Sequence, residues 1–115
     1  MKFRVKRVYD PPSREDGYRV LVDRIWPRGL SKDQAAVDLW LKEIAPSTEL
    51  RRWFNHDPDK WREFESRYRR ELAGLPEYVD RLKIRAESSR VTLLYAAKNT
   101  RHNNAVALKS FLESR

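Results

Sequence analysis

The sequence predicts an α/β domain with a small, mostly parallel sheet flanked by about five helices, and three observations support this fold class. An almost unbroken apolar run at residues 91–97 is typical of a strand covered by helices on both faces. Two N-terminal segments have strand patterns, whereas the middle of the chain has apolar residues at helical spacing. A length of 115 residues is that of one domain, so residues 1–115 are expected to form a single unit.

The composition excludes several classes of protein. Cysteine is absent, which rules out a disulfide framework, a thiolate nucleophile and a zinc–thiolate site. No apolar run approaches the ~18 residues of a membrane span, and the N-terminus lacks the apolar segment of a secretion signal. We therefore expect a soluble cytoplasmic protein that does not enter a membrane. No Gly-rich phosphate loop or dinucleotide fingerprint is present, so no cofactor is predicted.

The net charge of +8 indicates an anionic ligand or nucleic acid as a partner. Residues 1–32 contain nine basic against four acidic side chains, and residues 91–115 contain four against one. Residues 33–90 contain twelve of each sign and are interpreted as a salt-bridged helical surface. The excess positive charge therefore belongs to the predicted strands and their loops.

Residues 2–9 alternate, with Phe3, Val5 and Tyr9 on one side, and predict a half-buried strand. A turn rich in proline and acidic residues, 10–17, separates it from a second strand at residues 18–25. The connection is short enough for a hairpin, but it also allows a looser crossing in which the two strands lie apart.

Pro27 and Gly29 end the second strand, and a helix is expected after them. Ser31 and Gln34 have the spacing of a capping box, in which each side chain satisfies a free backbone N–H group. This helix would continue to about residue 45, because four apolar residues follow at helical spacing: Val37, Trp40, Leu41 and Ile44.

Four further helices complete the predicted order of elements. Ser47 can cap a short helix that ends near Phe54, and Asp57 with Pro58 can start a third. The third helix would end at Gly74, and a fourth would begin at Pro76. The last follows residue 104, with apolar positions at Ala105, Leu108 and Leu112.

The turn at residues 98–104 is the first candidate site. It follows the most apolar strand and precedes a helix, and ligands of open α/β sheets bind beyond the carboxyl ends of the strands. Lys98 supplies charge, while Asn99 and Thr100 lie where free backbone N–H groups can bind an anion. The alternative is that Asn99 or Thr100 only caps the last helix.

Asp23, Arg24 and Arg28 form a second polar corner at the end of the strand at 18–25. If this strand lies parallel beside residues 91–97, both corners emerge at the same edge of the sheet. Arg24, Arg28 and Lys98 would then converge on one anion. The alternative is that Asp23 and Arg24 only form ion pairs with neighbouring residues.

His102 is the leading candidate for proton transfer, because imidazole titrates near neutral pH, and Asp23 or Tyr95 could assist it. The alternative is an ordinary histidine in a surface turn. The segment at residues 56–59 contains one histidine and two aspartates. It fits no recognised ligand spacing, so no metal is predicted.

The four tryptophans and the first two helices allow a nucleic-acid interpretation, which we disfavour. Three tryptophans fall on apolar helix faces and are expected in the core, namely Trp40, Trp53 and Trp61, whereas Trp26 is a candidate pocket wall. Residues 33–54 could form a helix-turn-helix, but the second helix would present apolar residues instead of base-reading side chains.

Several strings of residues resemble the bacterial YeaO-like family along the whole chain: Lys6-Arg7-Val8-Tyr9-Asp10, Asp16-Gly17-Tyr18-Arg19, Leu21-Val22-Asp23-Arg24-Ile25-Trp26-Pro27-Arg28-Gly29, Ala45-Pro46-Ser47-Thr48 and Leu93-Leu94-Tyr95-Ala96-Ala97-Lys98-Asn99. The resemblance implies a domain of unknown function with an α/β fold and no settled activity. Some members carry the label of a MarR-type transcriptional regulator, but the strand pattern here does not resemble a winged helix. Distant branches place Cys-His-Arg after the last strand, where this chain has Arg101-His102-Asn103 and therefore no thiol chemistry.

The favoured hypothesis is an uncharacterised domain that binds a small anionic ligand, including a phosphorylated one, at the turns after Asp23 and Ala97. Whether it is also an enzyme stays open, as does its oligomeric state. The alternatives are a nucleic-acid-associated basic module, whose binding would weaken steeply with salt, and a protein-interaction domain.

Overall fold

A computed structural model describes residues 3–114 and confirms the α/β fold with a parallel sheet. The sheet has four strands in the order β1-β4-β2-β3, and every neighbouring pair is parallel. Their bounds are Phe3–Arg7 for β1, Tyr18–Leu21 for β2, Leu39–Trp40 for β3 and Val91–Tyr95 for β4. The predicted first strand began at Lys2, which lies outside the described residues.

The first two strands do not form a hairpin, because β4 lies between them. Val91 pairs with Phe3 of β1 on one side and with Tyr18 of β2 on the other. All five residues of β4 are buried, whereas most residues of β1 are only partly buried or exposed. The most apolar strand therefore occupies the centre of the sheet, and the looser crossing is the connection that the chain uses.

The helices are α1 (Lys32–Ala35), α2 (Thr48–Phe54), α3 (Trp61–Ala73), α4 (Pro76–Ser88) and α5 (Asn104–Glu113). Three short 3-10 turns lie at Arg14–Asp16, Lys42–Ile44 and Pro58–Lys60. The predicted caps Ser47 and Asp57 each accept a backbone N–H group at the start of a helical segment. Within residues 3–114, no helix has both the length and the apolar character needed to cross a bilayer.

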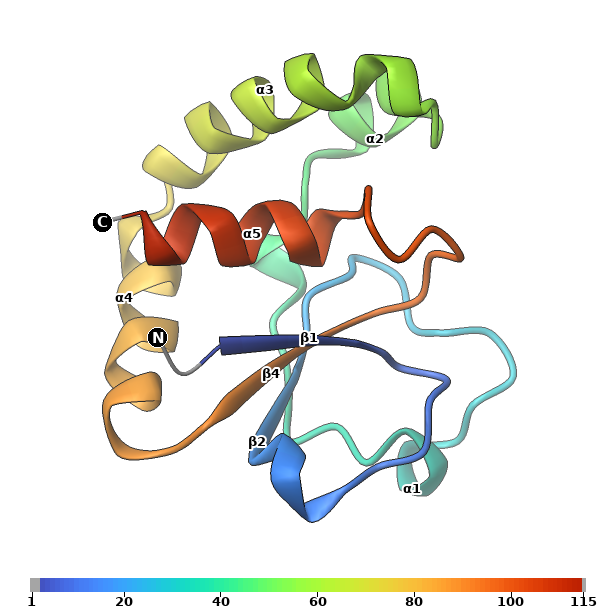
Figure 1. Cartoon of the computed structure of the whole chain (residues 1–115), viewed down its shortest axis with the longest axis vertical. Coiled ribbons are helices and arrows are strands. Elements are labelled where there is room, and N and C mark those ends of the chain that lie inside the picture. Colours follow the sequence, from blue (N-terminus) through green and yellow to red (C-terminus); the bar gives the residue numbers. More distant parts are fainter. Residues whose placement is uncertain (1–2, 115) are drawn as a thin grey trace.

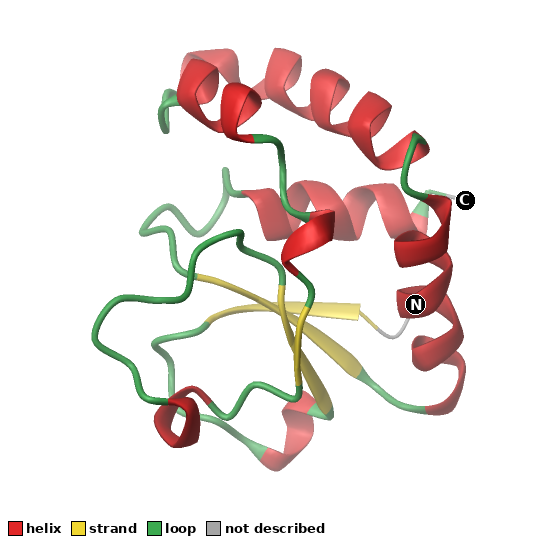
Figure 2. Ribbon diagram, turned by 180° about the vertical axis from the view of Figure 1, so that it is seen from behind, coloured by secondary structure: helices red, strands yellow, loops and turns green. Residues whose placement is uncertain are grey.

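The long helices gather on one face of the sheet (Figure 1 and Figure 2). Val20, Leu93 and Tyr95 share a core with buried residues of α3, α4 and α5. On the opposite face, Leu21 and Leu94 pack against Ala35 of the single-turn α1 and against loop residues. The expected helical cover is therefore present on both faces of residues 91–97, although on one face it consists only of the single-turn α1 and loop residues.

The helix predicted to run to residue 45 is wrong beyond its first turn. The capping box of Ser31 and Gln34 is present, but α1 ends at Ala35, and Ala36 adopts a left-handed conformation with φ 49°. The chain then pairs with the edge of β2, where Leu41 N–H donates to Leu21 O at 2.9 Å. Satisfying this edge outweighs the helical spacing of the apolar residues. The helix-turn-helix interpretation is wrong for the same reason.

We predict that Gly17→Ala destabilises the fold more than Gly29→Ala. Both glycines have positive φ, +66° and +83°, and an alanine there costs about 1–2 kcal/mol. A Cβ at Gly17 would also lie 2.3 Å from the carbonyl oxygen of Arg90, whereas a Cβ at Gly29 meets no atom within 4 Å. Urea unfolding of the two variants measures the difference, and equal losses of unfolding free energy would contradict it.

Candidate functional site

Two loops leave the sheet at the same edge because β2 and β4 are parallel neighbours. Val22 N–H donates to Leu94 O at 3.1 Å and extends the pairing by one residue beyond β2. The chain from Asp23 and the chain from Ala96 then run beyond this edge, on the side of the molecule where α5 begins (Figure 1). The strands β2 and β4 therefore have the parallel arrangement that brings the two polar corners to the same edge of the sheet.

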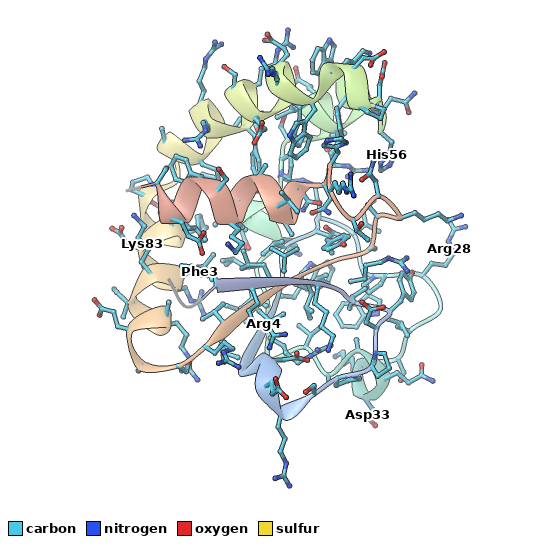
Figure 3. All side chains as sticks on the ribbon, viewed as in Figure 1. Phe3, Arg4, Arg28, Asp33, His56 and Lys83 are labelled. Atoms are coloured by element: carbon cyan, nitrogen blue, oxygen red, sulfur yellow. The ribbon has the colours of Figure 1, made fainter. Side chains whose placement is uncertain are left out.

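A cavity of about 720 Å³ lies beyond this edge of the sheet. Four parts of the chain line it: the loop after β2, the residues on either side of and within α2, Phe64 of α3, and the segment from Ala96 to Asn104 at the start of α5. Figure 3 shows Arg28 and His56, two of its lining residues, on the same side of the molecule, opposite Lys83. The lining residues are Asp23, Arg24, Ile25, Trp26, Arg28, Ala45, Pro46, Arg51, Arg52, Phe54, Asn55, His56, Phe64, Ala96, Ala97, His102, Asn103 and Asn104.

Asp23 ties the two loops together. One carboxylate oxygen accepts the N–H of Ala96 at 2.9 Å, and the other accepts the side-chain amide of Asn104 at 3.0 Å. The same Asn104 amide also donates to Val22 O at 3.0 Å. Burial raises the pKa of Asp23, although the two N–H donors and the positive charge of Arg51 oppose the rise. Asp23 therefore connects the two loops through hydrogen bonds. It forms no ion pair within residues 3–114.

Four arginines give the cavity its charge: Arg24, Arg28, Arg51 and Arg52. The Arg24 guanidinium donates from Nη2 to the carbonyl oxygens of Ala45 at 3.2 Å and Pro46 at 3.4 Å. Its Nε is buried and has no hydrogen-bond partner among the described residues. The other three arginines are exposed, and no described carboxylate lies within ion-pair distance of any of the four. Within the part of the chain that the structure describes, Asp23 is the only acidic side chain in the lining.

The loop before α5 is held by asparagines. Asn99 Oδ1 accepts the N–H groups of Arg101 and His102, each at 2.9 Å. Asn103 donates from Nδ2 to Asn99 O and accepts the N–H of Val106 at 2.9 Å. The cap of α5 is therefore Asn103, and the alternative in which Asn99 or Thr100 caps this helix is wrong.

The predicted ligand-binding residues divide into two groups. Arg24 and Arg28 line the cavity, whereas Lys98, Asn99 and Thr100 are not among its lining residues. Lys98 and Thr100 are exposed on the adjacent loop, and Asn99 shapes that loop through its hydrogen bonds.

The predicted proton-transfer residues also separate. Asp23 and His102 line the cavity, and the His102 ring lies with its centroid 5.0 Å from that of Trp61. Tyr95 is buried in the sheet and is not part of the lining, and burial raises the pKa of its hydroxyl.

A family model described as the inactive DUF488-N3 subclade matches residues 2–115. The chain belongs to this family. It is also 47% identical to the uncharacterized protein YeaO of Escherichia coli over 99% of both chains. It is 41% identical to the uncharacterized protein Rv3073c of Mycobacterium tuberculosis, over 99% of this chain and 96% of the relative. The resemblance to the YeaO-like family is thereby confirmed, and no solved structure matches.

In this member of the YeaO-like family, the cavity lining also contains residues that were not predicted from the sequence. Arg51 and Arg52 lie in the last turn of α2, followed by Asn55 and His56. The Arg-Arg pair on a short helix was the available signal, but residues 33–90 balance in charge and were interpreted as a salt-bridged surface. The net charge of a long segment does not show on which face of a helix its basic or acidic side chains lie.

The prediction of a core position is correct for Trp53 and Trp61 and wrong for Trp40. Trp53 and Trp61 pack partly buried against the core, but Trp40 is 36% exposed at the sheet edge. Trp40 contacts Trp26 edge to face at 5.5 Å and donates from Nε1 to Asp23 O at 2.8 Å. Trp26 lines the cavity, as expected of a pocket wall.

We predict that Asn104→Ala lowers the free energy of unfolding by roughly 1–3 kcal/mol, because it leaves Val22 O and one oxygen of Asp23 without a donor. Thr100→Ala is the control, since Thr100 is exposed in the adjacent loop and its replacement should change stability by about 0.5 kcal/mol at most. Chemical denaturation monitored by tryptophan fluorescence measures both, and an unchanged midpoint for Asn104→Ala would show that this bridge is unimportant.

Proposed function

We propose that this chain binds a small anionic ligand, such as a phosphorylated compound, in the cavity at the carboxyl ends of β2 and β4. The observation that carries the proposal is the charge of the lining, which contains four guanidiniums without an ion-paired carboxylate and a single acidic side chain. Guanidinium groups present paired donors that match phosphate and carboxylate oxygens. A ligand anion would supply the negative charge that the protein itself does not place beside them.

The start of α5 supports the same ligand chemistry. Asn103 and Asn104, the cap and first residue of this ten-residue helix, both line the cavity. The N-terminal end of a helix carries partial positive charge and favours anions. The helix dipole and the arginines therefore act in the same direction on a ligand in the cavity.

The proposed role is binding, because two of the three residues predicted to move a proton, Asp23 and Tyr95, are poorly suited to do so. Both oxygens of Asp23 already accept N–H groups, which leaves this carboxylate poorly placed to remove a proton. Tyr95 would need its phenolate form to act as a base, and its raised pKa disfavours that form. The description of the matching family as an inactive subclade agrees with this role.

Lys98 would act through longer-range attraction, because it is exposed on the loop beside the cavity. Asn99 and Thr100 would contribute by setting the course of this loop. Arg24, Arg28, Arg51 and Arg52 are the residues proposed to contact the anion.

Arg51→Ala combined with Arg52→Ala should strongly reduce stabilisation by inorganic phosphate and pyrophosphate. We expect both anions to raise the thermal midpoint of the wild-type protein at constant ionic strength, because they bind only the folded state. The double variant should show a much smaller rise, and differential scanning fluorimetry measures it.

The matched control removes the same charge outside the cavity, by Arg14→Ala combined with Lys32→Ala. Both residues are exposed and neither lines the cavity. The control should respond to phosphate as the wild type does. Equal responses in the two double variants would reject the cavity as the site, and strong salt-sensitive retention of duplex DNA would favour the nucleic-acid alternative.

A further inference from the structure

We infer that the anion is the phosphate of a mononucleotide, whose base packs against the aromatic part of the same cavity. This inference rests on the proposed function and names the class of ligand. Besides its arginines, the lining contains Phe54, Phe64, His56 and His102. Trp26 is a fifth aromatic ring of the lining, and a site for a bare anion needs none of these rings.

Four of these rings and that of Trp61 form a continuous cluster from two distant parts of the chain. Phe54 lies with its ring centroid 4.4 Å from that of Phe64 and 6.5 Å from that of His56. Trp61 stacks on Phe64 at 5.5 Å and lies 5.0 Å from His102. His56 is exposed and His102 partly exposed, whereas both phenylalanines are buried. The two imidazoles are therefore the rings most accessible to a base that enters the cavity.

The backbone that presents His56 has an uncommon conformation. Asn55 and His56 both have positive φ, 47° and 56°. Few residues other than glycine have positive φ, although asparagine and histidine are among the types enriched there, and sparsely populated backbone conformations cluster at functional sites. Asn55 also lines the cavity, so its exposed amide can donate to and accept from the edge of a base.

The size of the cavity agrees with a ligand that has several parts. Pockets of roughly 300–1,000 Å³ bury most of an organic ligand, and this cavity of about 720 Å³ falls within that range. Phosphate alone would leave most of it to solvent. Arg51 and Arg52 precede His56 by only a few residues, so one segment supplies both phosphate-binding and base-stacking groups.

Isothermal titration calorimetry with four probes tests the inference: inorganic phosphate, ribose 5-phosphate, adenosine and AMP. AMP should bind at least about tenfold more tightly than ribose 5-phosphate, because stacking of one base on an aromatic side chain contributes a factor of that order. Adenosine should bind more weakly than AMP, since it lacks the phosphate. Four mononucleotides with different bases then show which base is preferred.

The ring contribution is tested by His56→Ala combined with His102→Ala, which should reduce the preference for AMP over ribose 5-phosphate to less than threefold. His56→Phe with His102→Phe keeps the rings and should keep the preference. Circular dichroism checks the fold, and the single variant His56→Ala, at an exposed position, gives the same comparison if the double variant does not fold.

Each result decides between the two proposals. Equal affinities for AMP and ribose 5-phosphate overturn the mononucleotide inference and leave anion binding intact. The absence of binding by every phosphate-bearing probe overturns both. An unchanged AMP preference after both histidines are replaced by alanine overturns the assignment of the base to the aromatic cluster.

Discussion

The parallel pairing of β2 with β4 is the constraint on which the rest of the site depends. The paired residues are 73 positions apart in sequence, since Val20 pairs with Leu93 and Leu21 with Leu94. Parallel strands release their following loops at the same edge, so two basic corners that could have lain anywhere on the surface become neighbours. The burial of every β4 residue holds this strand at the centre of the sheet and thereby fixes the pairing.

Asp23 holds the two loops together and also reduces the repulsion among the arginines of the cavity. Its carboxylate accepts one backbone and one side-chain N–H group from the β4–α5 segment. Among the described residues it is also the only acidic side chain in the lining, and the charge of Arg51 acts on it. One partly buried carboxylate thus limits the repulsion among four guanidiniums without neutralising them. The net result is a cavity that is still positive and that has one wall fixed by hydrogen bonds.

Much of the fold could be predicted because local signals agreed with the tertiary structure. The abrupt change from apolar to polar residues after position 97 marked a strand, a turn and a helix, and the cap residues Ser31, Ser47 and Asp57 marked helix starts. The helix prediction beyond Ala35 is wrong because the edge of β2 needs partners for its backbone hydrogen bonds. No local sequence pattern reveals this need.

The candidate site was only half visible in the sequence. Asp23, Arg24 and Arg28 stand at a strand end, where the sequence pattern draws attention to them. Arg51 and Arg52 belong to a helix that reaches the cavity through tertiary packing alone. The unbroken polarity of residues 98–104 also hid their different roles. Asn99 fixes the loop without lining the cavity, His102 and Asn104 line the cavity, and Asn103 does both.

Anomalous diffraction from crystals grown in selenate is the most direct test of anion binding in the cavity. The crystal form must leave the cavity open to solvent. Selenate has the charge and shape of sulfate, and its selenium atom locates it without ambiguity. We expect a selenium peak in the cavity, within hydrogen-bonding reach of the guanidiniums of Arg24, Arg28, Arg51 or Arg52. Selenium peaks confined to the protein surface outside the cavity, with the cavity filled by water alone, would contradict anion binding in the cavity.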